Sequence, residues 1–173
     1  MNAAGSEGAG TSSEQSGEER ALAALERAGL AHEVTRHGRV GSLEEAARVR
    51  GVQPRDIVKT LVVRRAEGDY LFVLVPGDRE ISWPKLRALL GVNRLSMPDA
   101  ATAQVATGYE RGTITPFGSA TAWPVVADAS LTAEPGRLIS MGAGAHGAAV
   151  TVDAAAALEH LQAQVADVTE PAG

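Results

Sequence analysis

The sequence predicts an α+β fold, in which helices and strands are mixed without strict alternation. Two segments, Ser16-Gly-Glu-Glu19 and Ser42-Leu-Glu-Glu45, have the spacing of a capping box at a helix start. Two β-branched, apolar segments, 57–65 and 70–75, are separated by Ala66-Glu-Gly-Asp69 and predict a β-hairpin. The 173 residues, 45% of them hydrophobic, suffice for one domain with an aliphatic core.

The domain is expected to occupy residues 17–168. Residues 1–16 consist of small and polar residues with almost nothing to bury, and predict a disordered tail. Residues 169–173 are expected to form a flexible C-terminus.

Caps and glycines delimit the elements of the first half. In chain order they are a helix from Ser16 to Gly29, a strand over 31–36, a helix from Ser42 to near Gly51, the hairpin, a turn at Pro76-Gly-Asp78, and a helix capped by Ser82 that stops at Gly91.

The second half has shorter apolar segments between turn residues. They predict a short helix over Asp99–Thr107 that ends at Gly108, strands over 124–127, 137–140 and 148–152, and a closing helix from Asp153 to about Ala166.

The composition excludes several classes of protein. The chain has no cysteine, which removes disulfides, thiolate catalysis and thiolate metal sites. The formal net charge of -5 argues against bulk electrostatic coating of nucleic acid. No apolar run approaches the roughly 20 residues that span a bilayer. The four histidines lack metal-binding spacing, and no Gly-x-Ser-x-Gly elbow is present. We therefore expect no metal and no cofactor, and a cytoplasmic protein.

The loop Gly112-Thr-Ile-Thr-Pro-Phe-Gly118 is the first candidate site. Glycine at both ends allows backbone conformations closed to other residues and a close approach by a ligand. Pro116 fixes one φ angle and favours an extended Thr115, so the loop is expected to be stiff. Its backbone amides could hold a carbonyl oxygen or a sugar, with Thr115, Pro116 and Phe117 as candidate substrate contacts.

Three further positions leave two interpretations open. Lys59, in an apolar strand, either reaches a partner or snorkels to water. Asp128, at the end of the predicted strand over 124–127, either caps the next turn or holds a substrate amine. The segment Gly142-Ala-Gly-Ala-His-Gly147 is either a flexible loop or a pocket lip with His146 as a hydrogen-bonding group. It lacks the ending of a P-loop and precedes a strand, so a nucleotide-phosphate site is not expected.

The order of several segments is more specific than any one of them. The chain resembles the YbaK/ProX family in five segments that follow one another in the family's order. They are Asp56-Ile-Val-Lys-Thr-Leu-Val-Val63, Val75-Pro-Gly-Asp-Arg-Glu80, the loop 112–118, Pro124-Val-Val-Ala-Asp128, and Ser140-Met-Gly142 with Gly147. These proteins are aminoacyl-tRNA editing domains related to the insertion domain of bacterial prolyl-tRNA synthetases. The resemblance covers residues 20–165.

The resemblance implies a mixed, partly barrel-like β-sheet with flanking helices. It also implies hydrolysis of the ester of a mischarged tRNA, of the Cys-tRNA(Pro) or Ala-tRNA(Pro) type. By this resemblance Lys59 matches the lysine that contacts the terminal nucleotide or the acyl region of the substrate. Gly112 matches the loop glycine whose backbone docks the aminoacyl end, and both residues are expected to be catalytic. Thr60, Ser140 and Gly142 fall in matching segments and are expected to contact substrate. Family members often carry a basic pair where this chain has Ala145-His146.

The expected partners are the 3′ end of mischarged tRNA and, as a candidate, prolyl-tRNA synthetase, with the chain itself a monomer. One alternative is a non-catalytic module that binds an aminoacyl-tRNA end or a translation factor. Another is hydrolysis of a small ester or amide unrelated to tRNA.

Overall fold

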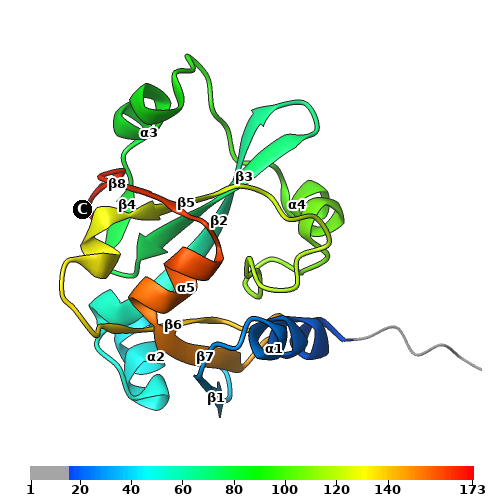
Figure 1. The fold of residues 1–173 in the computed structure, drawn as a ribbon, viewed down its shortest axis with the longest axis vertical. Coiled ribbons are helices and arrows are strands. Elements are labelled where there is room, and N and C mark those ends of the chain that lie inside the picture. Colours follow the sequence, from blue (N-terminus) through cyan, green and yellow to red (C-terminus); the bar gives the residue numbers. More distant parts are fainter. Residues whose placement is uncertain (1–15) are drawn as a thin grey trace, which may run out of the picture.

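The computed structural model describes residues 16–173, so the predicted tail lies outside the described residues apart from Ser16 (Figure 1). The elements are, in chain order, α1 (Gly17–Arg27), β1 (His32–Arg36), α2 (Leu43–Arg50), η1 (Pro54–Asp56), β2 (Ile57–Ala66), β3 (Asp69–Pro76), β4 (Arg79–Ile81), α3 (Trp83–Leu90), α4 (Ala100–Thr107), β5 (Val125–Asp128), η2 (Ala129–Thr132), β6 (Leu138–Gly142), β7 (Ala148–Asp153), α5 (Ala154–His160), β8 (Gln164–Ala166) and β9 (Thr169–Pro171). The α+β class is confirmed. None of the described helices is long and apolar enough to span a bilayer.

Local capping explains where the first helices begin. The Ser16 hydroxyl accepts a hydrogen bond from the backbone N–H of Glu19, and the Ser42 hydroxyl accepts one from Glu45. Each bond satisfies one of the backbone N–H groups that have no partner within the first turn of the helix. At the end of α2, Gly51 takes a left-handed conformation with φ of 72°, as a helix-stopping glycine does. The sequence prediction for these helices is therefore confirmed.

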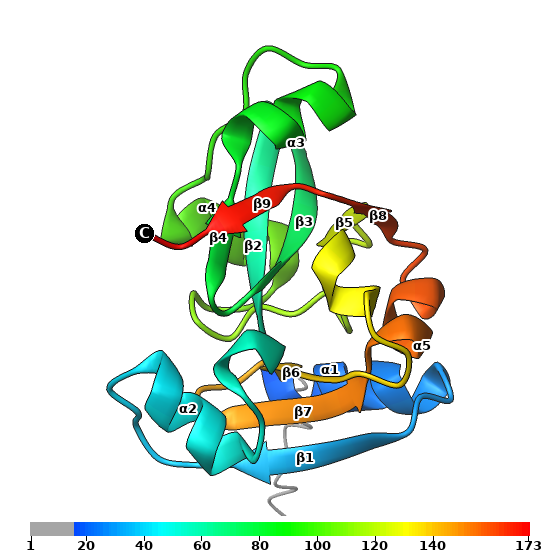
Figure 2. The same cartoon turned by 90° about the vertical axis from the view of Figure 1, so that its left-hand side faces the viewer.

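Seven strands form one mixed sheet in the order β1-β7-β6-β2-β3-β5-β8. Strands β2 and β3 are the predicted hairpin, with Lys59 opposite Val75. In Figure 2, β6, β7 and β1 run crosswise to β2 and β3, so the sheet bends sharply between β6 and β2. Strands β1 and β8 lie at opposite edges and do not pair, so the described strands form an open sheet and not a closed barrel.

The central hairpin is buried on both faces. Val58 and Val62 pack in the larger hydrophobic cluster with Phe72. Val63 packs on the other face in a second cluster, which includes Leu86 of α3. Burial on both faces holds β2 rigidly, and the residues between these valines are positioned with it.

The end of the chain corrects two expectations. Helix α5 ends at His160 and not near Ala166, because Gln162 adopts a positive φ of 52° and the chain continues as β8 beside β5. Residues 169–173 were expected to be flexible. Instead Thr169–Pro171 pairs with β4, a three-residue strand that the sequence did not predict, and Thr169 is fully buried.

Candidate functional site

A cavity of about 590 Å³ lies between β2, the start of α4 and the loop that follows α4. Its lining residues from these elements and from β6 include Lys59, Thr60, Arg111, Gly112 and Gly142. The strand with Lys59 and the loop with Gly112 are far apart in the sequence and therefore meet in one cavity only through the fold. The resemblance led us to expect that they share a site, and the fold supplies the geometry for it.

One edge of β2 is open along this cavity. Strand β6 pairs only with Ile57 and Val58, and the next contact on that edge is at Arg64, which exchanges two backbone hydrogen bonds with Ser96 at 2.7 and 3.2 Å. Backbone groups alternate in direction along a strand, so Thr60 and Val62 direct their N–H and C=O toward the gap between these two contacts. An unpaired strand edge offers donors and acceptors to a ligand.

Thr60 adds a second unsatisfied group at the same place. Its Oγ1 is the one buried side-chain nitrogen or oxygen in residues 16–173 that has no hydrogen-bond partner. A buried hydroxyl without a partner costs free energy unless a ligand supplies one. The strand edge and this hydroxyl together mark the cavity wall at Thr60 as a place where a polar ligand gains hydrogen bonds.

Lys59 reaches a partner, the first of the two interpretations that its position allows. Its Nζ donates a hydrogen bond to the backbone oxygen of Arg79 at 2.6 Å. Burial lowers the pKa of Lys59, and the carboxylates of Glu80 and Asp78 oppose that shift. An ammonium group has three donors, so Lys59 keeps donors for a ligand after the bond to Arg79.

The loop 112–118 is held in place at several points. Gly112 and Gly118 have positive φ angles of 89° and 73°. The buried hydroxyl of Tyr109 donates to the backbone oxygen of Phe117 at 2.6 Å, and the N–H of Gly144 donates to the oxygen of Thr113 at 3.0 Å. These bonds support the prediction of a stiff loop.

Only the first part of the loop borders the cavity. Gly112 and Ile114 line it, and their N–H groups donate to no acceptor within residues 16–173. Pro116 and Phe117 instead line a second cavity of about 610 Å³, together with His160. Thr115 is buried, and its hydroxyl accepts a hydrogen bond from the N–H of Phe117 at 3.3 Å. The structure therefore does not bring Thr115, Pro116 or Phe117 into the cavity beside Lys59.

Asp128 also lies away from this cavity. Its carboxylate accepts hydrogen bonds from the hydroxyl and the N–H of Ser130 and from the N–H of Val168. Burial alone would raise the pKa of Asp128, but the hydrogen bonds from Ser130, Val168 and Thr169 outweigh it and lower the pKa. These contacts fit the capping interpretation and leave the carboxylate without a role at the cavity.

Ser140 and His146 lie next to the cavity without lining it. Ser140 is fully buried, and its hydroxyl accepts a hydrogen bond from Arg50 at 3.5 Å. His146 is exposed and its Nε2 lies 3.3 Å from a carboxylate oxygen of Glu110. A β-carbon built on Gly112 would lie 3.6 Å from His146, so this histidine flanks the loop glycine.

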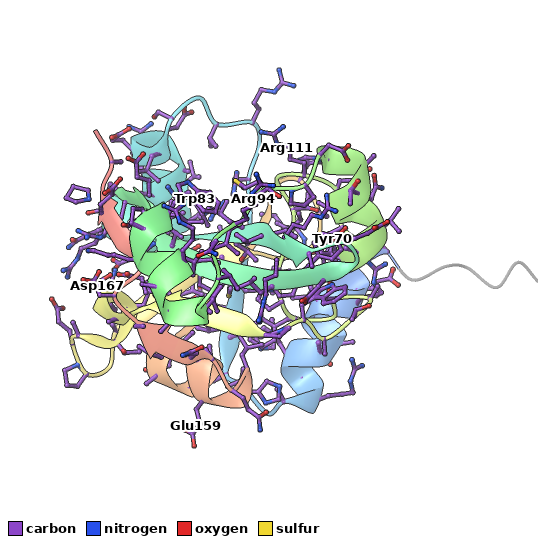
Figure 3. The ribbon with its side chains drawn as sticks, turned by 90° about the horizontal axis from the view of Figure 1, so that it is seen from above. Tyr70, Trp83, Arg94, Arg111, Glu159 and Asp167 are labelled. Carbon is purple, nitrogen blue, oxygen red and sulfur yellow. The ribbon has the colours of Figure 1, made fainter. Side chains whose placement is uncertain are left out.

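Sequence reasoning missed two cations of the lining, Arg50 and Arg111. Arg111 directly precedes Gly112, and Figure 3 shows it beside α4. Its place next to the candidate glycine was a usable signal. Arg50 is the last residue of α2, and no motif or spacing connects it with β2 or the loop.

Comparisons with known proteins identify the family to which this fold is similar. The model of the aminoacyl-tRNA editing domain matches residues 37–159. A proline–tRNA ligase of Thermosipho africanus is 38% identical over 80 residues, which are 46% of this chain and 14% of the ligase. One of Desulfovibrio desulfuricans is 40% identical over 90 residues, 52% of this chain and 15% of the ligase. The chain thus matches only a small part of these enzymes.

A solved structure matches nearly the whole chain. It belongs to a candidate trans-editing enzyme for prolyl tRNA synthetase, with a TM-score of 0.79 and 27% sequence identity. The superposition covers 89% of this chain and 97% of that one. Unlike the ligases, this protein is therefore about as long as the described part of the chain.

Proposed function

The chain belongs to the aminoacyl-tRNA editing domain family, and from this premise we propose that it hydrolyses the ester of mischarged tRNA. The observation that carries the proposal is that Lys59 and Gly112 line one cavity although they lie far apart in the sequence. The proposed substrate is Cys-tRNA(Pro) or Ala-tRNA(Pro). The names of the relatives support the choice of tRNA(Pro), since they are proline–tRNA ligases and a candidate trans-editing enzyme for prolyl tRNA synthetase. The choice of cysteine or alanine follows from the resemblance to the family alone.

The proposed reaction needs positioning more than a strong nucleophile. An aminoacyl ester is already activated, so water can attack its carbonyl carbon. The carbonyl oxygen becomes an oxyanion, and the intermediate collapses to release the free amino acid and the ribose hydroxyl of the tRNA. The N–H groups of Gly112 and Ile114, which have no acceptor in the described chain, are proposed to donate to this oxyanion. Removal of one such donor raises the activation barrier by about 2.7–4 kcal/mol.

Lys59 is proposed to hold the substrate in register with these amides. Its ammonium group is held by the hydrogen bond to the backbone oxygen of Arg79, and its backbone belongs to a strand that is buried on both faces. A charge held in this way needs little reorganisation when the substrate arrives. The open edge at Thr60 is proposed to receive the polar groups of the acyl end.

Editing of this kind serves fidelity because one binding step discriminates poorly. A pocket that separates two amino acids differing by one methylene gains only about 1–3 kcal/mol. A second, hydrolytic inspection multiplies the selectivity of the first. The proposed enzyme would remove the errors that a synthetase leaves on tRNA(Pro).

The proposal is tested by incubating the purified chain with labelled Cys-tRNA(Pro), Ala-tRNA(Pro) and Pro-tRNA(Pro), each with and without prolyl-tRNA synthetase. We expect release of label from at least one mischarged tRNA and not from the correct one. Free cysteine and alanine esters serve as controls for a small-ester hydrolase. Binding of mischarged tRNA without any release of label would contradict the proposal and establish the binding module instead.

A further inference from the structure

We propose that Arg50 binds the internucleotide phosphate next to the 3′-terminal adenosine of the tRNA. The inference rests on the proposed function for the identity of the ligand, and it assigns a residue at which this chain would read the nucleic-acid part of its substrate.

Arg50 is a half-buried cation without a carboxylate partner. It lies at the end of α2 and lines the cavity that holds Lys59 and Gly112. No ion pair joins Arg50 to an acidic residue of the described chain, and burial lowers the pKa of Arg50 with no carboxylate opposing it. A partly buried charge without a counterion is costly unless a ligand supplies the opposite charge.

Two neutral groups orient the guanidinium. The Nε of Arg50 lies 3.4 Å from Nε2 of His37, and its Nη1 lies 3.5 Å from the hydroxyl of Ser140. The Nδ1 of His37 is 2.8 Å from the backbone oxygen of Gly38, which can only accept, so Nδ1 carries the proton. The other ring nitrogen, Nε2, is then free to accept from Arg50. His37 therefore holds Arg50 as a neutral acceptor and adds no charge that would compete with a ligand.

The guanidinium keeps donors for an anion. It has five N–H groups, and the contacts to His37 and Ser140 use one each, so three remain. A guanidinium presents its donors as a planar fork that fits two oxygens of a phosphate. The arrangement therefore fits a phosphodiester better than a carbonyl or a single hydroxyl.

The charge of the whole cavity agrees with an anionic ligand. Its lining contains three cations, Arg50, Lys59 and Arg111, and one carboxylate, Asp99. The carboxylate of Asp99 caps α4, because it accepts a hydrogen bond from the N–H of Thr102 at 2.7 Å. The chain carries a net charge of -5, so this positive cavity contrasts with the molecule as a whole. A local excess of positive charge attracts the backbone of a nucleic acid.

The test uses the dinucleotide CpA and its methylphosphonate analogue, which has the same bases and sugars but a neutral linkage. Binding of both probes to the full chain is measured by isothermal titration calorimetry. We expect the wild type to bind CpA about tenfold or more tightly than the neutral analogue, as for a charge-assisted hydrogen bond. In Arg50→Gln the ratio of the two affinities is expected to fall to near one. Arg50→Lys is expected to keep part of the preference, because lysine keeps the positive charge but lacks the planar, two-pronged donor geometry of the guanidinium.

Arg48→Gln is the matched control, because Arg48 lies on the same helix and is exposed. It removes the same charge and is expected to keep the wild-type preference. Thermal unfolding of each variant shows that the fold is intact. A wild-type preference in Arg50→Gln, or the absence of any preference in the wild type, overturns the proposal. Loss of the preference in Lys59→Met but not in Arg50→Gln also overturns it, as does equal competition by inorganic phosphate at the same concentration.

The outcome separates this inference from the proposed function. If Arg50→Gln loses the preference for CpA while the wild type releases no amino acid from any mischarged tRNA, the phosphate site stands and the deacylase proposal fails. If deacylation occurs and Arg50→Gln binds both probes as the wild type does, the deacylase stands and the role of Arg50 fails.

Discussion

Replacement of Lys59 by alanine is expected to lower the rate of deacylation by about a hundredfold or more, the size of effect seen when one preorganised donor is removed from an active site. The substitution deletes the only lysine of the cavity lining and leaves the Gly112 loop untouched. The fold is expected to survive, because the lost bond of the charged ammonium to the Arg79 oxygen is worth about 1.5–3 kcal/mol, less than the stability of a typical domain. Single-turnover release of label from mischarged tRNA measures the rate, and thermal unfolding measures the stability.

Lys85→Ala is the control for this variant. Lys85 also donates to a backbone oxygen, that of Thr169 at 3.0 Å, but it lies on α3 beside Asp167 and outside the cavity. It is expected to keep the wild-type rate. A Lys59→Ala protein that deacylates as fast as the wild type would remove the lysine from the mechanism.

Replacement of Gly112 by alanine is expected to give the second large loss, up to about a hundredfold in rate, because a shift of about 1 Å at a reacting centre has that effect. The sequence suggested that glycine at this position allows a ligand to approach the backbone closely. The structure gives a different reason: a β-carbon would make only ordinary contacts with His146, but the φ of 89° is one that alanine adopts only under strain. The loop must therefore move, and its amides move with it.

Gly136→Ala separates strain from function. Gly136 has a φ of 72°, lies in an exposed loop away from the cavity, and has no atom within 4 Å of an added β-carbon. Both variants are expected to lose about 1–2 kcal/mol of stability, but only Gly112→Ala is expected to lose activity. Equal rates in the two variants would show that the loop does not contact the reacting ester.

The parts of the fold set by local chemistry were predictable. Ser16 and Ser42 were expected to cap helices and do so, since a cap depends on residues three positions apart. The hairpin of β2 and β3 was equally clear from its two β-branched, apolar segments and its turn. Strands β4 and β9 were missed because each has only three residues and is defined by its distant partner. The early end of α5 depends on Gln162, whose positive φ no sequence pattern indicates.

The site was predictable only in part for the same reason. Lys59 and Gly112 stand in recognisable motifs, and the fold places both in one cavity. Phe117 was predicted to contact the substrate because it belongs to the same loop as Gly112. The loop turns at Pro116, however, so that Phe117 lines the second cavity. The role of Arg50 could not be predicted, because it rests on the contacts of its side chain with His37 and Ser140. These two residues come close to one another only because β1 and β6 both pair with β7.

The central claim is that the aminoacyl end binds between the open edge of β2 and the loop at Gly112. The most direct test is a crystal structure of the chain with 3′-alanylamino-3′-deoxyadenosine, in which an amide replaces the labile ester. We expect the carbonyl oxygen within hydrogen-bond distance of the N–H of Gly112 or Ile114 and the adenosine near Lys59. A ligand bound instead in the cavity lined by Phe117 and His160 would contradict the account.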